Sequence, residues 1–168
     1  MRFHIQTLGC KINQYESQSL RESWTARGWT EASGPLGADV VLVHTCAVTA
    51  GAVADSRGAV RRAGREAPGA RILVAGCAAQ TGPEAFEGLP GVEAVIGREA
   101  KAGLASWPDG ATAAEGGWPA FSISRYNRAR PVLKIQDGCS HCCTYCIVPR
   151  ARGGPRSRPF GQILAEAQ

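Results

Sequence analysis

The 168-residue sequence contains no apolar run long enough to cross a bilayer. Its longest apolar runs, such as residues 40–43 and 72–75, are far shorter than the ~20 residues that a membrane-spanning helix needs. The first residues alternate between polar and apolar types, so they lack the continuous apolar core of a secretory signal peptide. We therefore expect a cytoplasmic protein that makes no contact with a membrane.

A dinucleotide-binding signature and an even set of cysteines are also missing. Residues 8–11 read Leu-Gly-Cys-Lys, without the Gly-x-Gly-x-x-Gly turn that binds a pyrophosphate, which argues against a dinucleotide cofactor. The seven cysteines are an odd number in a sequence without an export signal, so a disulfide framework is disfavoured. We expect the cysteines to serve in metal binding or catalysis instead.

Excess positive charge is absent from the first part of the sequence and concentrated in the last. Residues 1–120 contain 11 Lys or Arg and 12 Asp or Glu, a net charge of −1. Residues 121–168 have a net charge of +6, from Asp137 and Glu166 against eight basic residues: Arg125, Arg128, Arg130, Lys134, Arg150, Arg152, Arg156 and Arg158. A basic segment of this kind indicates an anionic partner, with nucleic acid the leading candidate, although a solvated basic face fits the charge equally well.

Strand patterns recur through the first hundred residues. Residues 2–8 alternate in polarity like a half-buried strand. Residues 39–43 and 71–75 are continuous apolar runs of the kind found in strands covered on both faces, and residues 92–96 are a fourth short candidate.

Helical patterns fill the spaces between these strands. Asn13 and Glu16 have the spacing of a capping box at the start of a helix that Gly28 ends, and residues 52–66 predict a second helix. Alternation of strands and helices predicts an α/β fold built on a doubly wound parallel sheet.

Composition divides the sequence into two domains. We expect residues 1–102 to form the α/β domain and residues 103–124, in a region rich in Gly, Ala and Pro, to form a linker. Residues 125–168 begin a second domain with a strand at 132–136, a cysteine- and arginine-rich loop at 137–159 and the start of a helix. This is too little chain to bury a core, so we expect an incomplete second domain and a fragment of a longer protein.

Cys139, Cys143 and Cys146 lie in one short loop with the spacing Cys-x3-Cys-x2-Cys. Three such thiolates can hold three irons of a [4Fe–4S] cluster and leave the fourth iron open to S-adenosylmethionine (SAM), as radical SAM chemistry requires. Cys142 also has a Cys-x3-Cys spacing with Cys146, so the spacing alone leaves the register open. The alternative is a zinc knuckle, but no second pair of Cys or His ligands follows at zinc spacing. We expect His141, inside the loop, to be a bystander.

Cys10, Cys46 and Cys77 each follow a predicted parallel strand. The carboxyl ends of such strands share the edge of the sheet where ligands bind, so three distant cysteines would meet there. Together they could hold a second [4Fe–4S] cluster, again with one open iron. The alternative is three buried or free cysteines, because Cys is a common small core residue. His44 is a weaker alternative ligand.

Several segments resemble the methylthiotransferase family of radical SAM enzymes. They read Gly-Cys-Lys-Ile-Asn-Gln-Tyr-Glu at 9–16, Thr-Cys-Ala-Val-Thr at 45–49, Ala-Gly-Cys-Ala at 75–78, Lys-Ile-Gln-Asp-Gly-Cys at 134–139 and Pro-Arg-Ala-Arg-Gly at 149–153. The resemblance implies that Cys139, Cys143 and Cys146 hold the cluster that binds SAM, with Cys142 a spare. It implies that the other three cysteines hold an auxiliary cluster that transfers sulfur, and that the second domain begins a radical SAM partial (β/α) barrel.

The resemblance also implies a reaction and partners. Family members use one SAM to methylate sulfur at the auxiliary cluster and another to generate a 5′-deoxyadenosyl radical, with electrons from a reductant such as flavodoxin or ferredoxin. The motifs look most like the branch that modifies threonylcarbamoyladenosine beside the anticodon of tRNA. The alternatives are the isopentenyladenosine tRNA branch, the branch that modifies an aspartate of a ribosomal protein, and another kind of radical SAM enzyme. An alternative of another class is a metal-stabilised RNA-binding module in which both sets of cysteines are structural.

Overall fold

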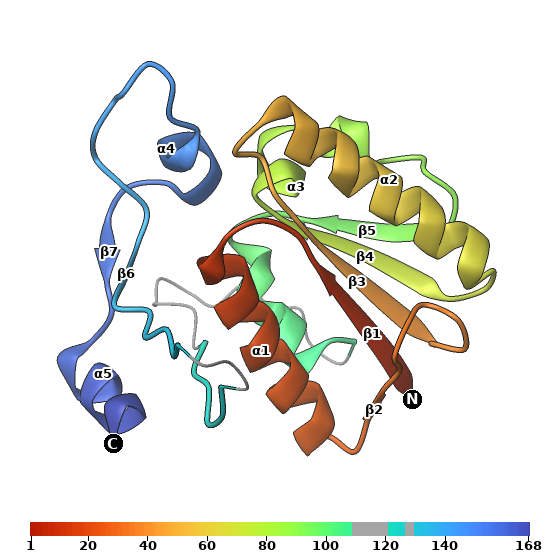
Figure 1. The fold of residues 1–168 in the computed structure, drawn as a ribbon, viewed down its shortest axis with the longest axis horizontal. Coiled ribbons are helices and arrows are strands. Elements are labelled where there is room, and N and C mark those ends of the chain that lie inside the picture. Colours follow the sequence, from red (N-terminus) through yellow and green to blue (C-terminus); the bar gives the residue numbers. More distant parts are fainter. Residues whose placement is uncertain (109–120, 127–129) are drawn as a thin grey trace.

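The computed structural model describes residues 1–108, 121–126 and 130–168, and a five-stranded parallel sheet lies at its centre (Figure 1). The strands are β1 (Arg2–Thr7), β2 (Thr30–Glu31), β3 (Val40–Thr45), β4 (Arg71–Gly76) and β5 (Val92–Ile96), in the order β2-β1-β3-β4-β5. Four of these strands were expected from the sequence, and the short edge strand β2 was not.

Helices cover both faces of the sheet, as expected for strands with continuous apolar runs. In Figure 1, α1 (Lys11–Ala26) lies on one face and α2 (Ala50–Glu66) on the other. Val41 and Val43 of β3 belong to the core beneath α2, whereas Leu42 between them belongs to the core that includes Leu20 and Trp24 of α1. The predicted doubly wound α/β fold is therefore confirmed for this part of the chain.

The capping box predicted at the start of α1 is wrong. The helix begins at Lys11 and its N-cap is Cys10, whose side chain accepts no capping hydrogen bond. Asn13 and Glu16 therefore lie inside the helix, and both side chains are fully buried. Their three-residue spacing, which suits a capping box, also places two side chains on the same face of a helix. The helix ends at Ala26, two residues before Gly28, which has a positive φ of 80°.

A 3-10 helix, η2 (Ala100–Ser106), packs against α1 on the same face of the sheet. Leu104 is 1% exposed and belongs to the core that contains Trp24, whose indole nitrogen donates a hydrogen bond to the Leu104 carbonyl at 2.7 Å. Trp107 and Phe121 are buried in the same core. The linker expected at 103–124 falls partly outside the described residues, because residues 109–120 are not among them.

Residues 130–168, here called the C-terminal segment, form short elements beside α1 (Figure 1). Strands β6 (Gln136–Asp137) and β7 (Arg156–Ser157) pair antiparallel, and α4 (Val148–Arg152) precedes β7. Helix α5 (Phe160–Ala167) follows, as expected. Helix α4 lies beside α3 (Cys77–Thr81), which follows β4, and a short 3-10 helix, η1 (Pro83–Ala85), leads from α3 towards β5.

The strand predicted at 132–136 is wrong, because only its last residue, Gln136, belongs to a strand. The apolar residues that suggested it, Leu133 and Ile135, are exposed, whereas the Lys134 between them is 2% exposed. This segment is therefore placed by the burial of a charged side chain and not by an apolar face.

Within the described residues, no helix combines the length and apolar character that crossing a membrane would require.

We predict that Leu104→Ala will lower the free energy of unfolding by about 2–5 kcal/mol, because it leaves a cavity in the core beneath α1. Urea unfolding followed by circular dichroism measures this loss. Leu36→Ala is the matched control, since the Leu36 side chain is 77% exposed and its removal should change little. Equal, small effects of the two substitutions would mean that residue 104 belongs to a linker and not to the folded domain.

Candidate functional site

The carboxyl edge of the sheet has a topological switch point between β1 and β3. Helices α1 and α2 leave these two strands on opposite faces, which opens the edge where ligands bind in folds of this order. Cys10 directly precedes α1, Cys46 directly follows β3, and Cys77 begins α3 at the end of β4. The structure thus places the three cysteines at the ends of three neighbouring strands.

Two glycines allow the backbone after β1 and the backbone at the end of β4 to approach the end of β3 closely. Gly9 has a φ of 88°, and a Cβ at this position would lie 2.6 Å from both Cβ and Sγ of Cys46. Gly76 has a φ of 104°, and a Cβ there would lie 2.5 Å from the carbonyl oxygen of Thr45. Only glycine allows both this conformation and this approach. The residues before Cys10 and Cys77 therefore let their loops close against the end of β3.

The three cysteines differ in exposure. Cys10 is exposed, whereas Cys46 is 4% and Cys77 is 9% exposed. Burial raises the pKa of the Cys77 thiol, and the positive charges of Arg152 and Lys101 oppose that rise.

The donors at this edge have the chemistry of iron–sulfur ligands. Within the described ranges, no three His, Cys, Asp or Glu side chains are grouped so that they could bind one metal ion. The donors of a [4Fe–4S] cluster need not converge on one point, because each thiolate binds a different iron of the cube. Three thiolates are soft ligands of the kind that such clusters use. The residues present therefore fit a cluster by their chemistry and by their shared edge.

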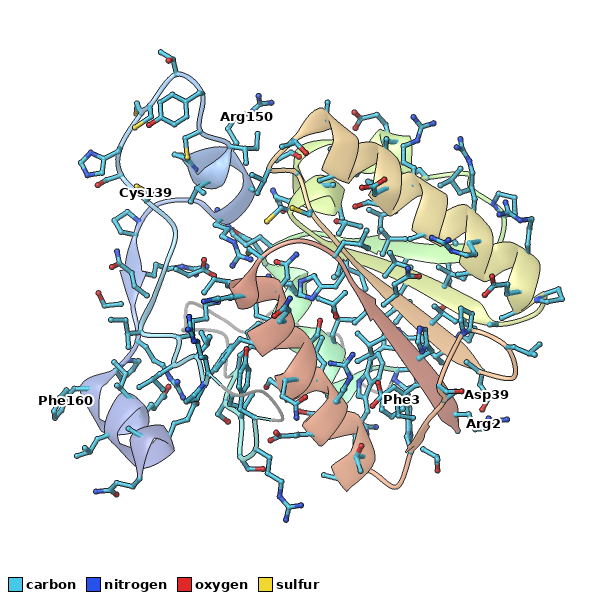
Figure 2. The ribbon with its side chains drawn as sticks, in the orientation of Figure 1. Arg2, Phe3, Asp39, Cys139, Arg150 and Phe160 are labelled. Carbon is cyan, nitrogen blue, oxygen red and sulfur yellow. The ribbon has the colours of Figure 1, made fainter. Side chains whose placement is uncertain are left out.

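The second set of cysteines lies on the loop that leads into α4. The Cys139 amide donates to the Gly153 carbonyl and the Cys146 amide donates to the Cys143 carbonyl, both at 3.0 Å. Figure 2 shows Cys139 on this loop, away from the sheet. Cys143 and Cys142 are exposed, and Cys139 and Cys146 are half-buried. The hydrogen bond to Gly153 thus closes the base of the loop, and the exposed cysteines lie on the part of the loop beyond it.

Between the two sets of cysteines lies a buried group of charges, here called the Glu16 cluster: Glu16, Lys101, Lys134, Asp137 and Arg152. Glu16 is fully buried, and its carboxylate accepts hydrogen bonds from Lys134 at 2.6 Å, Lys101 at 2.7 Å and Arg152 at 3.1 Å. Asp137 accepts from Lys134 at 2.8 Å and from Arg152 at 3.0 Å. Three cations thus share two carboxylates, which leaves one positive charge in excess.

The charges of the Glu16 cluster keep both carboxylates ionised. Burial alone would raise the pKa of Glu16, but Lys101, His44, Lys134 and Arg152 together hold it well below its usual range. Burial also acts to raise the pKa of Asp137, and Lys134 and Arg152 more than offset that effect. For Arg152, burial favours the neutral form, but the two carboxylates raise the pKa of the guanidinium overall.

His44 belongs to this buried network. Its Nδ1 lies 2.9 Å from the Ser17 hydroxyl, which accepts a hydrogen bond from the Thr7 hydroxyl at 2.8 Å. Its Nε2 lies 3.4 Å from the Glu16 carboxylate. Burial lowers the pKa of His44, so the ring is neutral near pH 7. The imidazole therefore faces Ser17 and Glu16, which accounts for it without a role as a metal ligand.

Asn13 connects the cysteine edge to the Glu16 cluster. Its amide nitrogen donates to the carbonyls of Leu8 and Thr45, both at 2.9 Å, and its amide oxygen accepts from Arg152 at 2.8 Å. Thr45 directly precedes Cys46, and Leu8 lies two residues before Cys10. One buried side chain thus joins the turns after β1 and β3.

A second buried ion pair holds the end of the C-terminal segment. Arg158 is 5% exposed and donates to Glu166 at 2.7 Å and to the Tyr15 hydroxyl at 3.1 Å. The Tyr15 hydroxyl also lies 3.0 Å from the Phe121 carbonyl. Burial, followed by the Glu166 carboxylate, raises the pKa of Tyr15, so the phenol stays neutral.

The basic character of residues 121–168 is therefore only partly a surface property. Lys134, Arg152 and Arg158 are buried and paired with carboxylates, so they are not available to a phosphate backbone. Arg128 lies outside the described residues. The exposed basic side chains of this region that the structure describes are those of Arg125, Arg130, Arg150 and Arg156.

Sequence patterns missed the roles of Asn13, Glu16 and Lys101. Glu16 is 85 residues from Lys101 and 136 residues from Arg152, and no local spacing signals such partners. The local sequence carried one indication of these roles: Asn13 and Glu16 lie on the same face of α1 as the apolar core residues Leu20 and Trp24.

We predict that Glu16→Gln will lower the free energy of unfolding by about 3–5 kcal/mol, because it leaves buried cations without their carboxylate. Because folding lowers the pKa of Glu16, its contribution is complete above the ordinary value of 4.5 and is lost as pH falls through the folded pKa. The difference between wild type and variant in urea unfolding should therefore be full at pH 7 and shrink in acid.

The control is Glu93→Gln, which removes an ion pair with Arg71 whose side chains are 37–43% exposed. It should change the unfolding free energy far less, because exposed pairs are screened by solvent. Equal losses for the two variants would contradict the central place of Glu16.

The sequence of this chain is similar to those of several curated proteins. The chain is 37% identical over 98% of its length to a threonylcarbamoyladenosine tRNA methylthiotransferase, MtaB, of Chlamydia pneumoniae, and covers 39% of that protein. It is 32% identical over its whole length to a ribosomal protein uS12 methylthiotransferase, RimO, of Chloroflexus aurantiacus, and covers 43% of that protein. It is 34% identical over 99% of its length to a tRNA-2-methylthio-N(6)-dimethylallyladenosine synthase of Sphingopyxis alaskensis, of which it covers 40%.

The chain thus spans about two fifths of the length of these curated relatives. A family model described as uncharacterized protein family UPF0004 matches residues 2–97, which contain the whole parallel sheet and the three cysteines at its edge. Because this match covers more than half of the sequence, the chain belongs to that family.

Proposed function

We propose that this chain forms the cluster-binding part of a radical SAM methylthiotransferase. The observation that carries the proposal is the position of Cys10, Cys46 and Cys77 at the ends of three neighbouring parallel strands. Helix α3, which begins at Cys77, packs against α4, the helix that follows the loop of Cys139, Cys143 and Cys146. Each set would supply three thiolates to one [4Fe–4S] cluster. Relatives named as methylthiotransferases support this reading along the whole chain.

The chain's own residues would arrange and tune these sites. Asn13 holds the turns before Cys10 and Cys46, and the Gly153 carbonyl closes the loop that carries Cys139. Arg152 and Lys101 of the Glu16 cluster oppose the rise in pKa that burial imposes on Cys77, and so favour the thiolate of that residue, which is the form that binds metal. When bound, the two clusters and SAM would supply the sulfur, methyl and radical chemistry.

For the substrate we propose a threonylcarbamoyladenosine of tRNA, next to the anticodon. Matches named MtaB, from Chlamydia pneumoniae and Bacillus subtilis, support this choice, at 37% and 35% identity. The dimethylallyladenosine and ribosomal-protein branches are the alternatives, and their representatives are 34% and 32% identical. A cytoplasmic location and a flavodoxin- or ferredoxin-type reductant fit such a reaction. Residues 1–102 would form the auxiliary-cluster domain and residues 125–168 the start of the SAM domain.

A metal-stabilised RNA-binding module is the competing function of another class. Absorbance of an anaerobic preparation distinguishes the two, because iron–sulfur clusters absorb broadly in the visible range and a zinc module is colourless.

We predict that the two sets of cysteines bind iron independently. Changing Cys139, Cys143 and Cys146 together to Ala should leave about half of the iron and sulfide of the anaerobically reconstituted protein. Cys142→Ala is the matched control in the same exposed loop, and it should keep the full content. Complete loss of iron from the triple variant, with its circular dichroism unchanged, would show a single shared cluster.

We predict that the exposed arginines beside the Cys139–Cys146 loop bind tRNA phosphates. Replacing Arg150 and Arg156 with Glu in the full-length protein should weaken tRNA binding and flatten its salt dependence, by roughly 0.7–0.9 in log–log slope for each arginine–phosphate pair removed. Fluorescence anisotropy at several salt concentrations measures both quantities. We choose these residues and not Arg158, because Arg158 is buried against Glu166.

The control is a double reversal at Arg61 and Arg65, which are exposed on α2. These residues lie towards the end of a helix that begins at the cysteine edge and runs away from it for roughly 25 Å. If both double variants weaken binding equally, the effect is one of overall charge, and a specific role for Arg150 and Arg156 in binding phosphates is refuted.

A further inference from the structure

Arg152 is attached to the loop of the second cysteine set through its backbone. It is the last residue of α4, and the N-cap of that helix, Ile147, directly follows Cys146. The next residue, Gly153, has a φ of 77°, and its carbonyl accepts the hydrogen bond from the Cys139 amide. Any movement of the Arg152 backbone is therefore passed to both ends of the Cys139–Cys146 loop.

The Arg152 side chain reaches the first cysteine set. One terminal nitrogen donates to Asn13 at 2.8 Å, and the other donates to Glu16 at 3.1 Å and to Asp137 at 3.0 Å. Asn13 in turn donates to the carbonyls of Leu8 and Thr45. Two hydrogen bonds in series thus connect Arg152 to the turns that carry Cys10 and Cys46.

Charge alone does not explain an arginine at this position. Lys101 and Lys134 already donate to the Glu16 carboxylate at 2.7 Å and 2.6 Å. Only a planar guanidinium can direct two nitrogens at fixed angles, one to the neutral amide of Asn13 and the other to the two carboxylates. The arrangement is thus suited to fixing geometry.

We propose that Arg152 is a positioning residue that fixes the Cys139–Cys146 loop relative to the edge that carries Cys10, Cys46 and Cys77. It thereby sets the separation and orientation of the clusters that these two sets would hold. This inference rests on the proposed function, since it concerns two clusters in one chain. It predicts that weakening this link leaves each cluster in place but changes how the two interact.

The molecule offers a matched control in Arg158. This residue is also a buried arginine of the C-terminal segment that contacts α1, through Tyr15, and a carboxylate, Glu166. Within the part of the chain that the structure describes, Arg158 donates to Tyr15, to Glu166 and, at 3.4 Å, to the backbone carbonyl of Lys134, and not to Asn13 or Glu16. Arg158→Lys therefore perturbs the docking of the same segment without loosening the connection between the two sets of cysteines.

The test is electron paramagnetic resonance of the full chain, reconstituted anaerobically and reduced with dithionite. Two paramagnetic clusters held close together broaden each other's spectra and shorten each other's relaxation times, and the triple cysteine variants supply the spectrum of each cluster alone. Arg152→Lys and Arg152→Gln should keep the wild-type iron and sulfide content and lose the mutual broadening. Arg158→Lys should keep both the wild-type iron and sulfide content and the mutual broadening.

Each other outcome decides against the proposal. Mutual broadening at the wild-type level in Arg152→Lys would show that the fork geometry is not needed. Loss of one cluster in that variant would make Arg152 a requirement for cluster assembly and not a positioning residue. If Arg152→Gln fails to fold, Arg152→Lys decides alone, because it keeps the positive charge. Wild-type protein with only one cluster would instead refute the proposed function.

Discussion

The buried carboxylate of Glu16 is the constraint on which the docking of the later parts of the chain depends. It lies on α1, and its three cationic partners come from η2, from residue 134 and from α4. A carboxylate this deep would be costly without such partners, and each partner would be costly to bury without the carboxylate. The described residues after β5 are therefore held against the sheet domain by these ion pairs together with the apolar contacts of Leu104 and Phe121.

The same charges lie beside the cysteine edge. Arg152 and Lys101 oppose the effect of burial on the pKa of Cys77, and Asn13 joins Arg152 to the turns after β1 and β3. The group that attaches the C-terminal segment is thus also the group that orders the proposed ligands. Structural and chemical roles are combined because both depend on buried polar side chains that pair with one another at one end of the sheet.

Sequence patterns succeeded where apolar periodicity decided the structure and failed where charge did. Strands β1, β3, β4 and β5 were predicted because their side chains face a core on one or both sides. The spacing of Asn13 and Glu16 was misread as a capping box, because a cap and a buried polar face use the same three-residue interval. The predicted strand at 132–136 failed because Lys134, and not its apolar neighbours, is the buried residue.

The sequence by itself determined the strand–helix alternation of a parallel α/β fold and the position of Cys10, Cys46 and Cys77 after its strands, because apolar runs and the residues that follow them are local properties. Only the tertiary structure decided which basic residues are free. Counting charges assigns residues 121–168 a net charge of +6, yet Lys134, Arg152 and Arg158 are buried against carboxylates. The physical reason is that ionic pairing depends on distance in space, and Glu16 meets partners 85 to 136 residues away.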